Sequence, residues 1–241
     1  MSIERKFAVN LAKKAGKIIK ENFGLAVKEE WKKDNTPVTK VDRTINRLMV
    51  DAVKKQFPGH SVLAEEGNYI LKNSEYVWVC DPLDGTLAFS RKIPMSTFIL
   101  SLVKNGKSIL GVVYEPFLNW MFTAEKGKGA FLNNKKISVS VNKYLDKSSV
   151  IAFSTRKEHR INLLGVFKSL KDQNIRIWTL GSAGYMGALV ACGKLDAYIT
   201  SIRNPYEAAA LKVIVEEAGG KVTDILGKEQ RYDKKIKGFL A

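Results

Sequence analysis

The sequence predicts an α+β fold, and three observations lead to that class. Residues 4–23 and 41–57 carry apolar side chains at the three- and four-residue spacing of amphipathic helices. Residues 97–132 contain four apolar segments separated by turn residues, which is the pattern of an antiparallel meander. After about residue 145, short apolar segments alternate with helical stretches, as in α/β units.

The first half begins with the helix over 4–23, which Gly24 ends. A short strand is expected over 25–33, a turn at Pro37, and then the helix over 41–57, with Asp42 in its first turn. A carboxylate there caps the helix or interacts with its dipole. Strands are then expected at 61–64, 76–80, 97–103, 107–114, 120–125 and 129–132.

The second half begins where the composition becomes polar, near residue 145. Strands are expected there at 149–153, 175–180, 195–200 and 221–225, and helices at 159–170, 182–192 and 205–218. We therefore expect two domains, an N-terminal α+β domain over 1–145 with an antiparallel sheet, and a C-terminal α/β domain over 146–241 that completes the site.

The composition excludes several classes of protein. The 241 residues carry a formal net charge of +16, but the lysines are scattered and form no basic block interleaved with aromatic residues. Nucleic-acid binding is therefore not expected, and the charge indicates a solvated surface or the steering of anionic ligands. No run of 18 apolar residues and no apolar signal sequence is present, which predicts a cytoplasmic protein without a membrane span. Cys80 and Cys192 are too few for a disulfide framework.

Two carboxylates, Asp81 and Asp84, follow the apolar strand expected at 76–80. Pro82 has no N–H to donate to a ladder, so we expect the strand to end there. Carboxylates this close repel each other unless a cation or a proton lies between them, and hard oxygen ligands suit Mg²⁺. On this stretch alone, an Asx-type turn in which both carboxylates only accept from nearby amides is an equally good interpretation.

Three more acids, Asp42, Glu65 and Glu207, also lie at expected strand or helix ends. If the strands that precede Glu65 and Asp81 are adjacent, their carboxylates converge. Two divalent cations about 3.5–4 Å apart could then clamp a phosphate, activate water and stabilise a leaving oxygen. Amides over 83–86 and 181–183 are candidate phosphate donors at helix starts, although an ordinary N-cap is the alternative for Gly181-Ser182.

Five motifs occur in one order along the chain: VTKVD at 38–42, AEEG at 64–67, DPLDGT at 81–86, GSA at 181–183 and EAGG at 217–220. In these motifs the sequence resembles the inositol monophosphatase family. That family belongs to the Mg²⁺-dependent, Li⁺-sensitive phosphatase superfamily, together with fructose-1,6-bisphosphatases and 3′(2′),5′-bisphosphate nucleotidases. The resemblance implies a five-layered α-β-α-β-α sandwich, usually as a homodimer, that hydrolyses a small phosphorylated molecule.

The resemblance also implies a role for each matching residue. Two or three Mg²⁺ ions would be bound by Glu65, Asp81, the carbonyl of Leu83, Asp84 and Glu207. Glu65 and Thr86 would hold and activate the attacking water, with Asp42 behind Thr86. The substrate would contact Asp84, Gly85, Thr86, Gly181, Ser182, Ala183 and Glu207.

The chain departs from the family pattern at two places that matter for function. Tyr206-Glu207 stands where the family has Trp-Asp, so the second metal is expected to be held differently or more weakly. Thr200 stands where the animal enzymes have an acid that contacts the inositol ring. Inositol phosphate, a related sugar phosphate, a bisphosphate sugar and a bisphosphate nucleotide therefore all stay open as substrates. A catalytically degraded protein that only binds a phosphate ligand is the alternative of another class.

Four basic residues are aligned with substrate-facing loops by the same resemblance: Arg91, Lys92, Lys194 and Arg203. They would favour a substrate with a second phosphate. Surface charge is the alternative interpretation of each.

Overall fold

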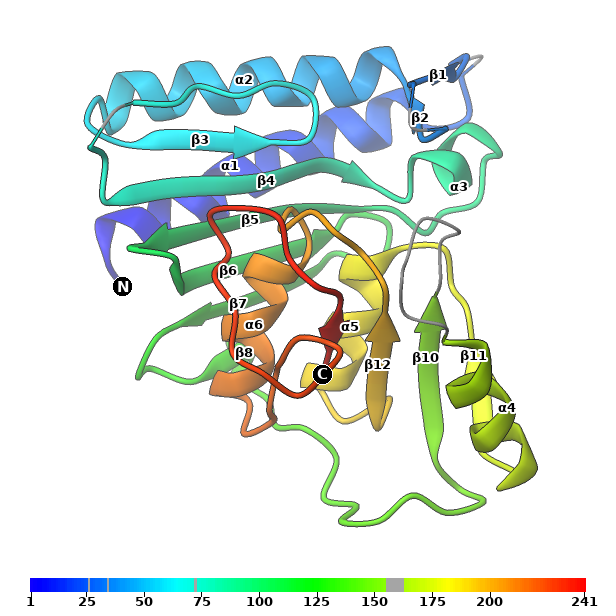
Figure 1. Cartoon of the computed structure of the whole chain (residues 1–241). Helices are drawn as coiled ribbons and strands as arrows, with labels where there is room; N and C mark the ends of the chain where they lie inside the picture. The colour runs from blue at the N-terminus through cyan, green and yellow to red at the C-terminus, as the bar shows by residue number, and fades with distance from the viewer. Residues whose placement is uncertain (26, 34, 72, 155–162) are drawn as a thin grey trace.

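The structure is a computed structural model that describes residues 1–25, 27–33, 35–71, 73–154 and 163–241 (Figure 1). Its first large sheet has seven strands in sequential order: β3 (Ser61–Ala64), β4 (Tyr76–Asp84), β5 (Thr97–Lys104), β6 (Lys107–Glu115), β7 (Trp120–Glu125), β8 (Ala130–Leu132) and β9 (Lys135–Lys136). β3 runs parallel to β4, and every later pair is antiparallel. The expected meander is therefore present, with β9 as an additional short strand.

Helices α1 (Ile3–Asn22) and α2 (Lys40–Gln56) lie on one face of this sheet (Figure 1). α1 begins at Ser2, whose side chain accepts from the amide of Arg5. α2 begins with a capping box, in which the amide of Thr39 donates to Asp42 Oδ2 at 2.8 Å and the amide of Val41 donates to Thr39 Oγ1 at 3.1 Å. The cap fixes where α2 starts, and thereby where Asp42 lies.

The opposite face of the sheet is covered by α5 (Ala183–Ala191) and α6 (Ala208–Glu217) (Figure 1). α6 lies very close to β6, because a Cβ on Gly111 would be only 2.6 Å from the carbonyl oxygen of Ala210. One buried apolar cluster joins the first sheet, both helices and the second sheet. The two helices are thus a layer between two sheets.

The second sheet has the order β11 (Arg176–Trp178), β10 (Val150–Ser154), β12 (Ala197–Thr200) and β13 (Phe239–Leu240). The first three strands are parallel, and β13 is antiparallel to β12. Helix α4 (Leu164–Asp172) packs on the outer face, where Leu170 joins Ile151 and Phe153 in a small core. Together with the elements above, this gives the expected α-β-α-β-α layers.

The strand expected over 221–225 is wrong. Thr223 makes only an isolated bridge to Leu240, and the edge beside β12 belongs to β13. The physical reason is Asp224, whose carboxylate accepts from the amides of Leu226 and Lys228 at 2.9 and 2.8 Å. A side chain that bonds its own following backbone in this way favours a turn over an extended strand.

The expectation that β4 ends before Asp81 is also wrong, since the strand continues to Asp84. Asp81 pairs with Ile99 and Asp84 pairs with Thr97, so β4 has an extra residue in a bulge between them. Residues three apart in a regular strand point to opposite faces. The bulge resets the alternation, which places both carboxylates on one face, and it accommodates Pro82, which has no N–H for the ladder.

The remaining differences are local. Within the described part of 25–33, only β1 (Glu30–Trp31) is extended, and it pairs with β2 (Pro37–Val38). The helix expected over 159–170 starts outside the described residues. A short helix, α3 (Thr86–Ser90), begins where a helix start was expected at 83–86. No helix among the described residues combines the length and apolar character that crossing a bilayer requires. The domain boundary near 145 stays a prediction.

Candidate metal centre

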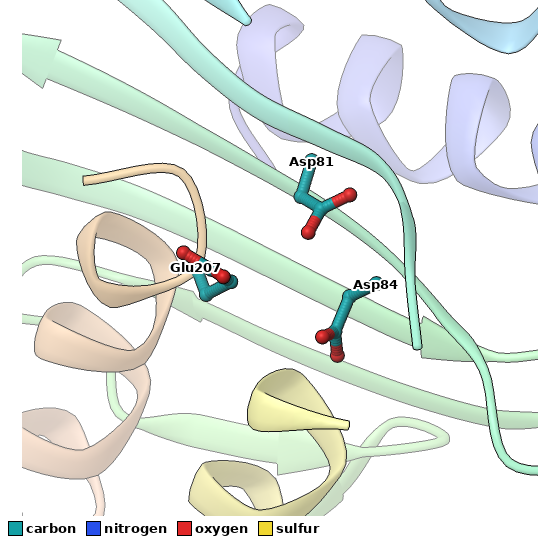
Figure 2. Close-up of side chains that lie close together, drawn as sticks. All are labelled: Asp81, Asp84 and Glu207. Carbon is teal, nitrogen blue, oxygen red and sulfur yellow. The ribbon is translucent and has the colours of Figure 1, made fainter. Parts of the chain in front are cut away.

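Three buried carboxylates, those of Asp81, Asp84 and Glu207, face one another where β4 meets the start of α6 (Figure 2). A ligand oxygen from each lies within 4.8 Å of the others. The three residues are 3%, 6% and 9% exposed. Three acids this close and this buried need a cation or protons to offset their repulsion.

Asp84 is held by four hydrogen bonds. Its Oδ2 accepts from Thr97 Oγ1 at 2.8 Å, Ser182 Oγ at 2.5 Å and the amide of Gly184 at 2.8 Å, and its Oδ1 accepts from the amide of Ala183 at 3.0 Å. Three of these donors come from the start of α5, where a negative charge is favoured. Burial nonetheless raises the pKa of Asp84 above its usual value, because the donors offset only part of the lost hydration.

Asp81 is much less well satisfied. Within the described part of the chain it accepts one hydrogen bond, from the amide of Leu83 to Oδ1 at 3.0 Å. Burial raises the pKa of Asp81 well above its usual value, and the negative charges of Glu65, Asp84 and Glu207 raise it further. A bound cation would remove the cause of that shift.

Glu65 directly follows β3, and its amide donates to the carbonyl oxygen of Cys80 at 3.2 Å. The Nζ of Lys32 lies 2.6 Å from Glu65 Oε1 and 2.8 Å from Glu66 Oε1. Although burial lowers the pKa of Lys32, these two carboxylates raise it overall. Nothing in the sequence distinguishes Lys32 from the other lysines, so its place beside Glu65 is apparent only in the fold.

Thr86 and Asp42 come together as the resemblance implies. Thr86 Oγ1 lies 2.9 Å from Asp42 Oδ1 and 2.9 Å from the carbonyl oxygen of Leu83. Asp42 is 2% exposed, and burial raises its pKa although Thr39 and Thr86 donate to it. Asp42 therefore serves both as the helix-capping residue and as the partner of Thr86.

The two groups of candidate phosphate donors lie at the starts of two helices, residues 83–86 at that of α3 and residues 181–183 at that of α5. Gly85 has a φ of 85° and begins α3, and a Cβ on it would be 2.7 Å from the carbonyl oxygen of Met95. Ser182 is the N-cap of α5, accepting from the amide of Tyr185 at 3.2 Å. The N-cap interpretation of Ser182 is thus confirmed, and the amide of Ala183 is directed at Asp84. Gly181 precedes the cap with a φ of 73°.

The structure shows the surroundings of Thr200 and of the four basic residues that the resemblance aligns with substrate-facing loops. Thr200 is 1% exposed, and its Oγ1 lies 3.1 Å from Ser154 Oγ, so no charge stands at this position. Arg91 lies 3.8 Å from Glu29, and the Nζ of Lys194 lies 5.9 Å from the ring centre of Trp120. Lys92 and Arg203 are exposed.

The model of the inositol monophosphatase family matches residues 2–240. The chain belongs to this family. A fructose-1,6-bisphosphatase/inositol-1-monophosphatase of Thermotoga maritima is 37% identical over 225 residues, which cover 92% of this chain and 85% of that protein. Nus factor SuhB of Escherichia coli is 32% identical over 226 residues, which cover 91% of this chain and 84% of that protein.

Solved structures of the family share the fold. An inositol monophosphatase of Thermotoga maritima matches with a TM-score of 0.86 and 35% identity, covering 98% of this chain and 90% of that one. An IMPase/NADP phosphatase complexed with Mg²⁺ and phosphate matches with a TM-score of 0.84 and 26% identity, covering 98% and 88%. The predictions of the family and of its sandwich fold are therefore confirmed.

The family depends on Mg²⁺, and the donor set of this chain fits that ion. Asp81, Asp84 and Glu207 offer carboxylate oxygens, the hard ligands that Mg²⁺ prefers. Burial is the main cause of the raised pKa of Asp81, the charges of Glu65, Asp84 and Glu207 add to it, and a cation among these acids would counter it. Asp84 is already oriented by its hydrogen bonds, as ligating carboxylates commonly are.

Proposed function

We propose that this chain is a Mg²⁺-dependent phosphomonoesterase that hydrolyses a small phosphorylated molecule, either an inositol monophosphate or a related sugar phosphate. The observation that carries the proposal is the buried cluster of Asp81, Asp84 and Glu207 at the junction of β4 and α6. The membership of the chain in the inositol monophosphatase family supports it.

Asp81, Asp84 and Glu207, together with Glu65 and the carbonyl of Leu83, would hold two or three Mg²⁺ ions. Bound Mg²⁺ would supply Lewis-acid activation of water and stabilisation of charge on the phosphate oxygens. Lys32 Nζ lies 2.6 Å from Oε1 of Glu65, so its ammonium would compete with Mg²⁺ for this carboxylate.

Thr86 and Asp42 would position the attacking water. The hydroxyl of Thr86 donates to Asp42, which leaves lone pairs on Thr86 Oγ1 that accept a hydrogen bond from water. Glu65 would accept the proton that this water loses. The backbone amides of Gly85 and Thr86 would hold the phosphate group, and Gly181, Ser182 and Ala183 would contact the rest of the substrate.

The position of Thr200 bears on the substrate. Its hydroxyl pairs with that of Ser154, so a polyol ring would find a neutral group here where the animal enzymes of the family have a carboxylate. Lys92 and Arg203 are exposed cations on substrate-facing loops by the resemblance. Fructose 1,6-bisphosphate and 3′-phosphoadenosine 5′-phosphate are therefore the alternative substrates.

A panel of substrates tests the proposal. Phosphate release is measured from inositol 1-phosphate, fructose 1,6-bisphosphate, 3′-phosphoadenosine 5′-phosphate and histidinol phosphate, with Mg²⁺ or EDTA, and with added Li⁺. We expect Mg²⁺-dependent release from at least one of them and inhibition by Li⁺. If no substrate is hydrolysed, or if Asp81→Asn retains full Mg²⁺-dependent turnover, the proposed mechanism is wrong.

A phosphate-binding protein without turnover is a second candidate, and specific observations favour it. Lys32 pairs with Glu65, the α5 amides are directed at Asp84, and Glu207 is one methylene longer than the family's aspartate. Glu207→Asp separates the two candidates. Activity that appears only in the variant favours the degraded protein, whereas activity that falls in the variant shows Glu207 to be the native ligand.

We also propose that the protein is a homodimer in the cytoplasm, as the resemblance implies. Light scattering on the purified protein measures the mass directly. A mass of 26.9 kDa, that of one chain, would contradict the dimer.

A further inference from the structure

A groove of about 780 Å³ lies away from the metal centre. Its walls are the turn between β5 and β6, the later part of α6, and the segment 224–237 that leads to β13. In Figure 1 this segment is the red trace that passes in front of the first sheet and α6. None of the residues proposed for the metal centre lines the groove.

The wall over 224–237 is attached to the β5–β6 turn at defined points. The amide of Tyr232 donates to the carbonyl oxygen of Gly106 at 3.0 Å, and Tyr232 is only 1% exposed. Gly106 has a φ of 84°, and a Cβ on it would be 2.6 Å from Cζ of Arg231. The guanidinium of Arg231 therefore packs directly on this turn.

The four acids that line the groove are already engaged within the protein. Glu216 and Glu229 both accept from Nζ of Lys212, at 2.6 and 2.9 Å. Glu217 accepts from the amides of Gly127 and Gly129, and Asp224 accepts from the turn that follows it. Each of these four carboxylates thus already accepts hydrogen bonds from groups of the protein.

The lysines that line the groove differ from these acids. Six of them are exposed and form no ion pair with any described residue: Lys107, Lys126, Lys228, Lys234, Lys235 and Lys237. Several cations that share one concave surface repel one another and attract an anion. The groove therefore lacks a negative partner.

We propose that this groove is a second binding site, for a small molecule that carries several phosphate groups. Its volume lies within the range of small-molecule sites, which is about 300–1,000 Å³. Single-stranded nucleic acid is disfavoured as the occupant, because the only aromatic residue in the lining, Tyr232, is buried and offers no surface on which a base could stack.

Titration calorimetry with inorganic tripolyphosphate tests the proposal. The titration is done in EDTA at physiological salt, so that the acidic metal centre does not bind the probe. We expect one site per chain, and an affinity lower by about tenfold or more in Lys234→Glu/Lys235→Glu, because two attractive charges become repulsive. The matched control is Lys143→Glu/Lys147→Glu, the same charge change at exposed residues outside the groove, with an affinity within about twofold of the unaltered chain.

Three results would overturn the proposal. The first is no binding of tripolyphosphate by the unaltered chain, and the second is an equal loss in both double variants, which would indicate net charge alone. The third is tight binding of a single-stranded RNA that Lys234→Glu/Lys235→Glu abolishes while tripolyphosphate does not compete. Circular dichroism of each variant confirms that it is folded. These results do not depend on whether the metal centre hydrolyses phosphate.

Discussion

The α5 side and the β3 side of the metal centre are built differently. On the α5 side, Asp84 accepts hydrogen bonds from Thr97, Ser182, Ala183 and Gly184. On the β3 side, Asp81 accepts one from Leu83, while Glu65 is paired with the side chain of Lys32. The fold itself therefore orients one ligand, whereas the other side depends on the ammonium of Lys32 or a bound cation to offset its charge.

The largest effect that would test this difference is expected from Asp84→Asn. The amide NH₂ of asparagine would face hydroxyl and amide donors, and one buried donor would be left unpaired, at a cost of about 1–3 kcal/mol in the free energy of unfolding. Loss of the ligand charge should also lower Mg²⁺-dependent phosphate release by about 10³-fold or more. Urea denaturation and phosphate release measure the two effects, and unchanged stability would show that the four donors are not essential.

Asp81→Asn should lower activity to a similar degree but change stability in the opposite direction. The pKa of Asp81 is raised in the folded protein, so its carboxylate is less stable there than in the unfolded chain. Removal of the charge should therefore stabilise the metal-free protein at neutral pH, since the asparagine oxygen can still accept from the amide of Leu83. If this variant is destabilised as much as Asp84→Asn, the two sides do not differ as described.

The pH dependence of the metal-free protein tests the same charges. An acid with a raised pKa binds protons more tightly in the folded state, so its destabilising contribution is absent below the unfolded pKa of about 4 and grows as the pH rises toward the folded value. Stability in EDTA should therefore fall as the pH increases from about 4 to 7. Mg²⁺ should raise the Tm more at neutral than at acidic pH. The expected rise is about 2–4 °C for each kcal/mol that the ion adds to the free energy of unfolding. Asp81→Asn should reduce this pH dependence. An unchanged slope of stability against pH would show that other groups cause it.

The smallest effect is expected from Lys32→Met. Removing the ammonium that pairs with Glu65 should lower the Mg²⁺ concentration for half-maximal activity by about threefold to tenfold, since the cation no longer competes with Lys32. The adjacent exposed residue supplies the matched control, Lys33→Met. A Mg²⁺ activation curve that shifts equally in both variants would indicate general surface charge.

The sequence predicted most of the fold because its signals are local. The spacing of apolar residues in α1 and α2 and the turns of the meander each depend on neighbouring residues. The two clear errors, the end of β4 and the strand over 221–225, arose where a side chain or a bulge changed the local pattern. Asp224 turns the chain through its own carboxylate, and the bulge at Pro82 keeps β4 in the ladder.

The sequence also predicted part of the candidate site. Asp42, Glu65, Asp81, Asp84 and Glu207 were grouped because each lies at an expected strand or helix end, and the family resemblance placed Asp42 behind Thr86. Lys32, Thr97 and Gly184 were missed, since their contacts with Glu65 and Asp84 connect distant parts of the chain. Four of the six unpaired lysines of the groove lie within residues 228–237, but only the fold shows that this segment faces the turn between β5 and β6.

The contacts of Asp84 also determine when the site can form. Its bonds to Ser182, Ala183 and Gly184 span 98, 99 and 100 residues of the chain. On the ribosome, about 5–20 s pass between the synthesis of Asp84 and that of its α5 donors, at roughly 5–20 residues per second. Until then β4 and β5 can pair, and Thr97 on β5 is the partner of Asp84 that is already available. The three bonds from the start of α5 can form only after that helix has been synthesised.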